Sequence, residues 1–298
     1  MKVSATAVKE LRELTNAGMM DCKNALLESD GNLEKAKIIL NEKGKSTADS
    51  KSGRTTAQGL VWIETEQESN LNHAVVLEVN CETDFAAKDN LFTEFVEKIA
   101  KLILEEGIDD MDQLHQQTMD DFKNLEDYRK FVISKLGENI TIRRFERFPI
   151  KGILGSYIHG SKIAALVLLD STDPGHSELA KDLAMHVAAS KPKYLSLSDI
   201  PEEIVKEEIR VLNLQAEEEG KPKDIIERIV KGKLAKQMSE FTLLEQEFIK
   251  DSDLNVSQLL KKSNTNVVLF VRYEVGDGIQ REMKNFADEV KEQVNASQ

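Results

Sequence analysis

The stretch AVVLEVNCETDFAAKD, residues 74–89, decides how the chain is organised. Its first part, AVVLEV, is an apolar run with the length of a buried strand. Its second part places Cys81, acidic residues, a threonine and Phe85 close together, where a turn after a strand is normally polar. Three interpretations are open at this point. The segment starts a helix, carries a catalytic carboxylate and thiol, or forms a loop that inserts into another molecule.

The composition describes a soluble, globular and helix-rich chain. Its 298 residues correspond to about two domains. Hydrophobic residues make up 40% and charged residues 31%, and 40 Lys and Arg against 53 Asp and Glu leave a net charge of −13 at pH 7. This balance argues against extensive binding to a nucleic-acid backbone, which needs a basic surface.

The cysteines and the chain start bear on the cellular compartment. Cys22 and Cys81 are far apart and have no metal-ligand spacing, so we expect neither a disulfide scaffold nor a zinc site. The start, MKVSATAVKEL, has no apolar signal core, and no later segment is long and apolar enough for a membrane span. We therefore expect a cytoplasmic protein.

Residues 1–44 are expected to form a small helical N-terminal domain with three short helices. Ser4 or Thr6 is placed to cap the first helix, and Asn32 is placed to cap the third. Gly44 is expected to end the third helix. The core of such a domain is very small, so it either stands alone as a mini-domain or docks on the rest of the chain.

Residues 45–58 are expected to be a linker, because they are rich in Gly, Ser, Thr and Lys and have no apolar period. The letters GKST at residues 44–47 resemble the end of a phosphate-binding loop. However, Ile39 stands where the first glycine of that motif belongs, and a helix rather than a strand precedes it. We expect no nucleotide site here.

Two segments share the order strand, turn, strand and amphipathic helix. The first is GLVWIETEQESNLNHAVVLEVN followed by NLFTEFVEKIAKLILEEG, and the second is GILGSYIHGSKIAALVLLDS followed by HSELAKDLAMHVAAS. This repetition indicates an internal duplication. We predict an α+β fold with a duplicated, two-lobed core, in which residues 59–137 form lobe 1 and residues 138–199 form lobe 2.

Residues 200–237 are expected to form a protruding antiparallel coiled-coil hairpin. Two long helical patterns with narrow apolar seams are separated by the turn KPK. The residues expected to face one another across the pair are Ile204, Ile209 and Leu212 on one helix and Ile225, Ile229 and Leu234 on the other. Residues 238–278 then return to the core, and residues 279–298 form a C-terminal helical module.

The sequence shows no convergent set of catalytic groups. No HExxH pair occurs among His73, His115, His159, His176 and His186, and there is no Gly-x-Ser-x-Gly elbow. Cys81 is either a buried structural thiol at a strand end, which is the usual state of a free cysteine, or the nucleophile of a thiol enzyme. We expect no catalytic residue, no metal site and no cofactor.

Two stretches resemble the signature segments of the bacterial elongation factor Ts family: LRELTNAGMMDCKNAL at residues 11–26 and LEVNCETDFAAKDN at residues 77–90. The segments GENITIRR, GSYIHG, AMHVAASKP, GKPK and EVGDGI follow in the order typical of the family, so the resemblance covers the chain from end to end. It implies the same architecture, with a UBA-like N-terminal domain.

The resemblance also implies a function. Proteins of this family are guanine-nucleotide exchange factors rather than enzymes. They bind elongation factor Tu in its GDP-bound and nucleotide-free states and promote GDP release and GTP loading during translation elongation. The resemblance implies no direct binding of nucleotide, DNA or membrane, and it allows a 2:2 assembly. From the residues alone, a scaffold that binds RNA or the ribosome through the linker lysines and IRRFER remains the alternative.

One group of site residues matches the loop that the family inserts near the Mg²⁺ and phosphate region of the GTPase. This group consists of Thr83, Asp84, Phe85 and Ala86. An exposed aromatic ring suits such a wedge because it contributes a large contact area at small entropic cost. The alternative from the residues alone is that Phe85 packs on the start of the following helix.

A second group matches the family's N-terminal contact with the GTPase, and it consists of Arg12, Met19, Met20 and Lys23. Flexible thioethers make adaptable contact surfaces. The turn residue His159 matches a third contact, although a turn histidine is also commonly just solvated.

Two residues depart from the family pattern. Asn16 replaces a glycine of the first signature, and Ala86 replaces a valine in the second.

Overall fold

The computed structural model describes residues 3–15, 17–66, 72–119, 122–218 and 223–279. Asn16 and the C-terminal helical module expected from residue 279 lie outside these ranges, apart from residue 279 itself. No helix in the described ranges is long and apolar enough to cross a membrane.

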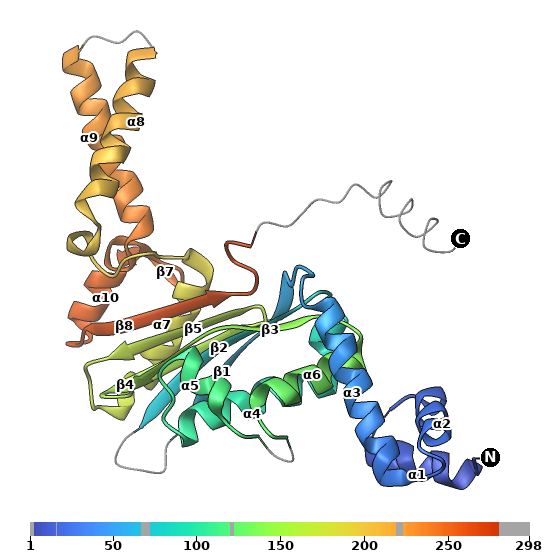
Figure 1. Cartoon of the computed structure of the whole chain (residues 1–298). Helices are drawn as coiled ribbons and strands as arrows, with labels where there is room; N and C mark the ends of the chain where they lie inside the picture. The colour runs from blue at the N-terminus through green and yellow to red at the C-terminus, as the bar shows by residue number, and fades with distance from the viewer. Residues whose placement is uncertain (1–2, 16, 67–71, 120–121, 219–222, 280–298) are drawn as a thin grey trace.

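The described chain combines helices and sheets, as the α+β prediction requires (Figure 1). Its α-helices are α1 (Ala5–Thr15), α2 (Met19–Glu28), α3 (Leu33–Lys51), α4 (Asn90–Glu105), α5 (Met111–Gln116), α6 (Leu125–Leu136), α7 (Ser177–Ser190), α8 (Glu202–Glu218), α9 (Lys223–Phe241) and α10 (Val256–Lys262). Its strands are β1 (Gln58–Thr65), β2 (His73–Cys81), β3 (Ile140–Pro149), β4 (Ile153–His159), β5 (Ile163–Leu169), β6 (Glu247–Phe248), β7 (Asp251–Asn255) and β8 (Val267–Glu274). Short 3-10 turns are η1 (Ala86–Lys88), η2 (Pro174–His176), η3 (Leu197–Asp199) and η4 (Leu243–Glu245).

Two antiparallel sheets form the centre of the molecule, with strand orders β1-β2-β3 and β4-β5-β8. In each sheet a hairpin is followed by a helix, and a later strand pairs with the second strand of the hairpin. Residues of both sheets, among them Val61 and Val76 in the first and Leu166 and Val271 in the second, share one buried cluster. The two sheets therefore pack face to face, and their outer faces carry helices.

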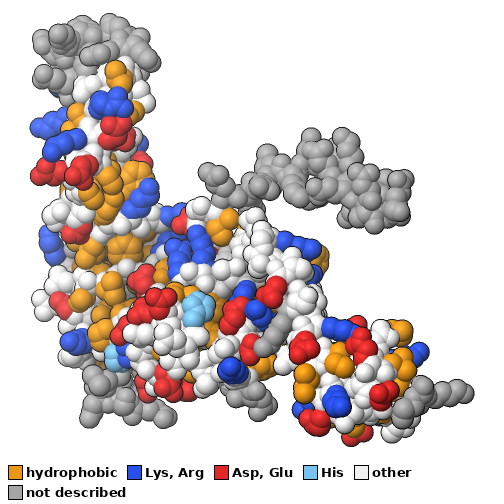
Figure 2. Space-filling view, viewed as in Figure 1, with side chains coloured by type: hydrophobic (Ala, Val, Ile, Leu, Met, Phe, Trp, Pro, Cys, Tyr) orange, Lys and Arg blue, Asp and Glu red, His pale blue; other side chains and the backbone are white. Residues whose placement is uncertain are grey.

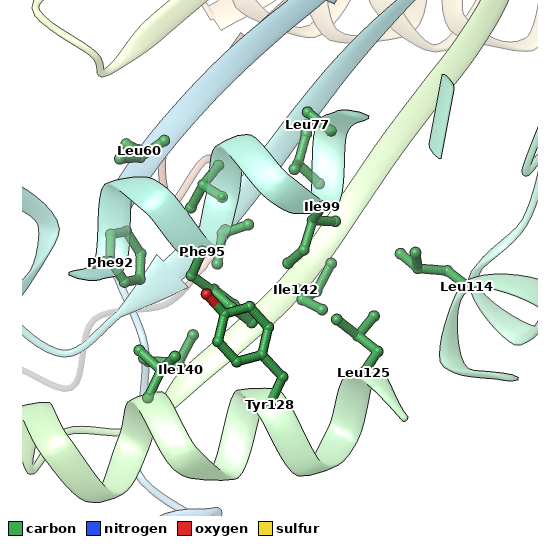
Figure 3. Packing of buried hydrophobic residues seen from close by; sticks show 14 of the residues in the cluster. Leu60, Leu77, Phe92, Phe95, Ile99, Leu114, Leu125, Tyr128, Ile140 and Ile142 are labelled. Atoms are coloured by element: carbon green, nitrogen blue, oxygen red, sulfur yellow. The ribbon is translucent and has the colours of Figure 1, made fainter. Parts of the chain in front are cut away.

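The outer face of the first sheet holds the largest described core (Figure 3). Leu77 of β2 packs there with Phe95 and Ile99 of α4 and with Tyr128 of α6. The rings of Phe95 and Tyr128 meet edge to face with centroids 5.0 Å apart. Because successive side chains of a strand point to opposite faces, the run AVVLEV fills this core and the interface between the sheets at once.

The outer face of the second sheet is covered by α7, and Gly155 of β4 permits the close approach. A Cβ atom at this position would lie 2.0 Å from the carbonyl carbon of Ala180 in α7. Val167 of β5 and Leu183 and Val187 of α7 belong to the resulting core. The strand–turn–strand–helix prediction is confirmed for both segments.

A buried carboxylate connects the first sheet to the end of β8. Glu78 lies on β2 with its side chain fully buried, and its oxygens accept hydrogen bonds from Arg143 (2.9 Å) and Arg144 (2.7 Å) of β3. The backbone N–H of Gly276, just after β8, donates to the same carboxylate at 2.8 Å. A charge inside a protein is tolerated when it is paired and hydrogen-bonded in this way.

The predicted end of the third helix at Gly44 is wrong, because α3 continues to Lys51. Gly44 lies against Ser134 of α6, and Ala48 is buried in the core of the first sheet. Asp49 forms an ion pair with Lys130 of α6 at 2.7 Å. Tertiary packing against α6 therefore overrides the low helix propensity of Gly, Ser and Thr, and the first half of the expected linker at residues 45–58, up to Lys51, is helix.

The expected boundary between the lobes, at residues 137 and 138, is also displaced. Strand β3 was assigned to lobe 2, but it pairs with β2 in the first sheet, with Cys81 opposite Ile140. The second sheet therefore begins at β4.

Helices α8 and α9 pack on each other and project from the body (Figure 1). Their buried seam contains Leu212, Ala216 and Val230, with Ile209 and Leu234 packed against it. Two predicted seam residues differ: Ile204 is exposed, and Val230 takes the place expected of Ile229. The side chain of Ile225 lies outside the described part.

The base of the hairpin is joined to α7 by His186, which is fully buried. Its Nδ1 accepts a hydrogen bond from the backbone N–H of Ile249 (3.3 Å), so its Nε2 carries the proton and donates to Oε1 of Gln246 (2.9 Å). The amide of Gln246 in turn donates to the carbonyls of Ser190 and Glu240. Burial lowers the pKa of His186 below its ordinary value of 6.5, and the hydrogen bond with Gln246 opposes this only partly.

We expect the stability of the protein to fall in mild acid because of His186. The folded protein binds this proton less readily than the unfolded chain, so the stabilisation is fully present above pH 6.5 and is lost as the pH falls from 6.5 through the lowered pKa. Thermal melting between pH 7.5 and 5 measures it. His186→Gln should flatten the dependence, whereas the control His115→Gln, at an exposed histidine, should not. Equal slopes for all three proteins would contradict this role.

Candidate functional site

Residues 83–86, which we call the tip loop, follow the end of β2. Phe85 is 80% exposed, although its neighbours Ala86 and Ala87 are buried in the core of the first sheet. The capping residue of α4 is Asp89, whose side chain accepts from the N–H of Leu91 at 2.8 Å. Phe85 therefore does not pack on the start of the helix, and Asp84 does not cap it.

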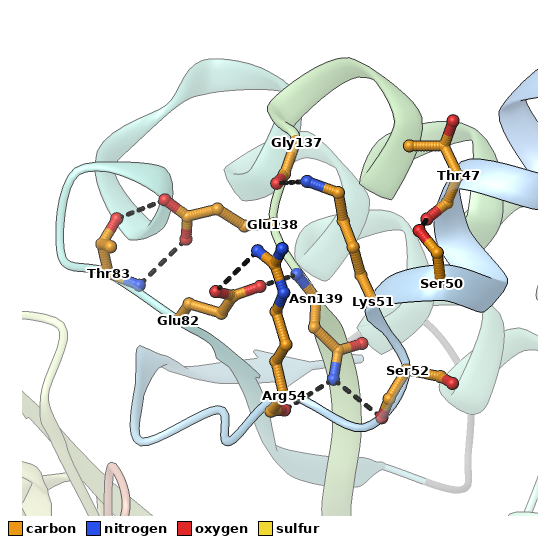
Figure 4. Close-up of polar contacts among 10 residues, drawn as sticks. All are labelled: Thr47, Ser50, Lys51, Ser52, Arg54, Glu82, Thr83, Gly137, Glu138 and Asn139. Carbon is orange, nitrogen blue, oxygen red and sulfur yellow. Dashed lines mark hydrogen bonds and ion pairs between the residues drawn. The ribbon is translucent and has the colours of Figure 1, made fainter. Parts of the chain in front are cut away.

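The tip loop is anchored through Thr83 (Figure 4). The backbone N–H and the hydroxyl of Thr83 donate to the two carboxylate oxygens of Glu138, at 2.9 and 2.6 Å. The hydroxyl of Thr83 also accepts from the N–H of Ala86 at 3.3 Å. Thr83 and Ala86 thus form the base of the loop, and Asp84 and Phe85 form its tip.

A second carboxylate connects the base of the loop to the end of α3 (Figure 4). Glu82 accepts from the backbone N–H of Asn139 at 2.6 Å and pairs with Arg54 at 3.4 Å. The amide of Asn139 donates to the carbonyls of Ser52 (3.2 Å) and Arg54 (2.9 Å). In addition, the ammonium of Lys51, at the end of α3, donates to the carbonyl of Gly137.

Asp84 is ionised at the tip. Lys88 donates to its carboxylate at 3.0 Å in an exposed pair four residues apart. This hydrogen bond and the charge of Lys88 hold the pKa of Asp84 below its ordinary value. The tip therefore presents an aromatic ring beside a carboxylate that carries its own counter-ion.

Cys81 has none of the properties of a catalytic thiol. It is fully buried, and its Sγ donates to the carbonyl of Thr83 at 3.1 Å. Burial raises the pKa of the thiol to about 12, and the nearby carboxylate of Glu138 adds to the rise. The thiolate is the nucleophilic form of cysteine, so this environment argues against the thiol-enzyme interpretation.

The turn that carries His159 lies near the same end of the first sheet. His159 is exposed, and its Nδ1 lies 3.0 Å from the hydroxyl of Tyr157. The next residues hold the turn against β1. The carbonyl of Ser161 accepts from Val61 N–H, and the ammonium of Lys162 donates to the carbonyl of Gly59. Because the start of β1 pairs with the end of β2, the structure brings this turn close to the tip loop.

The N-terminal group lies elsewhere, on the helices at the far end of α3 (Figure 1). Met19 and Met20 open helix α2 and are 60% and 62% exposed, and Arg12 and Lys23 are exposed as well. Lys23 lies one turn after the methionines on the same helix. Hydrophobic side chains are visible on the surface of these helices (Figure 2).

Sequence reasoning missed Glu138 and Asn139 as parts of the site. Both lie in GENITIRR, one of the segments that carry the family resemblance. The pairing of Cys81 with Ile140 places residues 82–83 beside residues 138–139. The pairing of β2 with β3 is therefore the signal that could have found them.

In the described ranges, no group of three or more His, Cys, Asp or Glu side chains is placed to hold a metal ion. The candidate site consists instead of an exposed ring on an anchored loop and exposed thioethers at a helix start. Aromatic rings and methionine side chains are enriched in protein interfaces. The fold and site define an α+β interaction protein.

Comparison with known proteins identifies the family. The model of the family described as Elongation factor TS matches residues 82–277. The chain is 44% identical to the elongation factor Ts of Hydrogenovibrio crunogenus over 97% of both chains, and 43% identical to that of Alkalilimnicola ehrlichii over the full length of both. It is 41% identical to that of Legionella pneumophila over 98% of both chains. The chain belongs to the elongation factor Ts family.

We expect neither cysteine to react in the folded protein. Both thiols are buried, and at neutral pH Cys81 holds its proton. An aromatic disulfide reagent should therefore label no thiol rapidly under native conditions and both after denaturation. In a Cys22→Ala protein, where Cys81 is the remaining thiol, rapid stoichiometric labelling of the folded state would contradict the buried assignment.

Proposed function

We propose that this protein is a guanine-nucleotide exchange factor that binds elongation factor Tu in its GDP-bound and nucleotide-free states and promotes replacement of GDP by GTP. The observation that carries the proposal, beside membership of the family, is Phe85, exposed on a loop whose base is fixed. The protein makes and breaks no bond in this process. It contributes the free energy of its contacts with the GTPase.

The tip loop acts as the wedge. Phe85 inserts into an apolar pocket of the GTPase near the Mg²⁺ and phosphate region, and burial of its ring provides the free energy that displaces the elements holding the ion. Asp84 enters beside it and places a negative charge near the phosphates and the metal. Such a charge disfavours bound phosphate and competes for its cation.

The N-terminal helices act as a second grip. Met19 and Met20 form the contact surface, with Arg12 and Lys23 at its edge, and the turn at His159 forms a third contact. Helix α3 connects the N-terminal helices to the core, and its end is held by Asn139 beside the tip loop. Two contacts on one framework reinforce each other, since the second forms at high effective concentration once the first is made.

Exchange by this route is negative coupling between two ligands of the GTPase. If the protein lowers the affinity of elongation factor Tu for GDP by some factor, GDP lowers the affinity for this protein by the same factor. The cycle therefore passes through a nucleotide-free complex, which GTP dissociates. The projecting pair α8–α9 is proposed to be a coiled coil, and it lies apart from the wedge.

The test of the function is the release of labelled GDP from elongation factor Tu in the presence and absence of this protein. Substoichiometric amounts should accelerate release, because each molecule is freed when nucleotide rebinds. Release at the same rate with and without the protein would overturn the proposal.

Phe85→Ala should slow catalysed GDP release clearly while leaving the free protein folded. The ring is exposed, so its removal should change the free energy of unfolding by no more than about 0.5 kcal/mol. Release rates and thermal melting are measured on the same sample. Leu197→Ala, at an exposed leucine near the hairpin base, is the control and should keep the normal rate. An early-melting Phe85→Ala protein with normal exchange would show that the ring is structural.

Replacing both Met19 and Met20 with alanine should weaken the complex rather than the fold. The two side chains are largely exposed, and each truncation at a well-packed contact costs about 1–2 kcal/mol of binding free energy. Calorimetric titration against nucleotide-free elongation factor Tu measures the affinity, and circular dichroism monitors the helices. Lost helicity with unchanged affinity would place the methionines in the core.

A further inference from the structure

Glu138, just before β3, binds Thr83 at the base of the tip loop. The other hydrogen bonds that fix the base of the loop also involve Thr83. Thr83 donates to Glu138 through both its N–H and its hydroxyl. The carbonyl of Thr83 accepts from Ala87 N–H at 3.3 Å and from the thiol of Cys81 at 3.1 Å, and its hydroxyl accepts from Ala86 N–H. Every polar group of Thr83 is thus engaged.

Glu138 is itself held on both sides. The residue before it, Gly137, ends α6 in the left-handed conformation with φ of 75°. The residue after it, Asn139, is 3% exposed and bound to two carbonyls at the end of α3. The carboxylate therefore projects from a fixed stretch of backbone. By contrast, Phe85 is 80% exposed, and its carbonyl accepts a hydrogen bond from Lys88 N–H at 3.1 Å.

We propose that Glu138 is a positioning residue for nucleotide exchange, which holds Thr83 so that Phe85 is already oriented for insertion when the GTPase docks. This inference rests on the exchange function proposed above. A loop ordered in advance loses less conformational entropy on insertion than a mobile one. A carboxylate is suited to this task because hydrogen bonds to an ionised acceptor are stronger than neutral ones.

Glu138→Ala tests the proposal in the GDP-release assay with elongation factor Tu·GDP. The kcat for release should fall at least about tenfold, because the change removes both charge-assisted hydrogen bonds that Thr83 donates. KM should stay that of the unaltered protein, because docking through Met19 and Met20 does not involve the loop. Glu138→Gln should restore most of kcat, since its carbonyl accepts from Thr83 N–H while its amide donates to the hydroxyl.

Thr83→Val tests the same contact at its other partner. It removes the hydroxyl that donates to Glu138 and keeps the shape of the side chain. It should lower kcat at constant KM, and the double variant with Glu138→Ala should lose less than the product of the two single losses. Independent, multiplicative losses would overturn the proposal. If Glu138→Ala melts below the assay temperature, Thr83→Val decides the question alone. Glu94→Ala, at an exposed glutamate on α4, is the matched control and should change nothing.

Amide hydrogen exchange measured by NMR separates this proposal from the exchange function. The N–H groups of Thr83 and Ala86 should exchange faster in folded Glu138→Ala than in the unaltered protein, without any GTPase present. If the unaltered protein does not accelerate GDP release, the proposed function is overturned. The amide result then decides separately whether Glu138 holds the tip loop. Unchanged amide protection, or unchanged kcat in a folded Glu138→Ala protein, would overturn the role of Glu138.

Discussion

The burial of strand β2 on both faces is the constraint on which the rest of the structure depends. One face supports the core with α4 and α6, and the other packs on the second sheet. A buried charge on such a strand is costly unless it is paired, and the carboxylate of Glu78 is met by Arg143, Arg144 and the backbone N–H of Gly276. These contacts tie β2, β3 and the end of β8 together. The tip loop thus leaves the molecule from one of its most constrained strands.

Much of this arrangement follows from sequence patterns. The runs AVVLEV and IAALVLL are nearly continuous in apolar residues because β2 and β5 are both covered on two faces. The repeated order of strand, turn, strand and amphipathic helix predicts both hairpin–helix units. The patterns did not reveal that α3 continues past Gly44, since its last turns depend on α6, which lies far along the chain. Nor did they reveal the sheet to which β3 belongs. Local propensity fails where a distant element supplies the partner.

The candidate site divides in the same way. The sequence could place Phe85 after a strand, but it left open whether the ring packs on the helix or faces outward. Capping of α4 by Asp89 and the burial of Ala86 and Ala87 turn the ring outward in the structure. The anchor of the loop lies 55 residues away, at Glu138, and only the register of β2 with β3 brings it there. An exposed aromatic ring can be read from a motif; the support that directs it cannot.

The distance between the two proposed grips is a property of the scaffold. The N-terminal helices pack on the first part of α3, and Lys135 of α6 donates to the carbonyl of Thr15 at 2.5 Å, so two separate contacts hold them to the body. The C-terminal end of α3 is bound by Asn139, one residue from the anchor of the tip loop. With a flexible linker, the two contact surfaces would lose conformational entropy when the partner binds. A continuous helix fixes their relative positions already during folding. Under the proposed function, selectivity for a GTPase would then rest on whether its two contact sites are spaced to match this framework, more than on the chemistry of any single side chain.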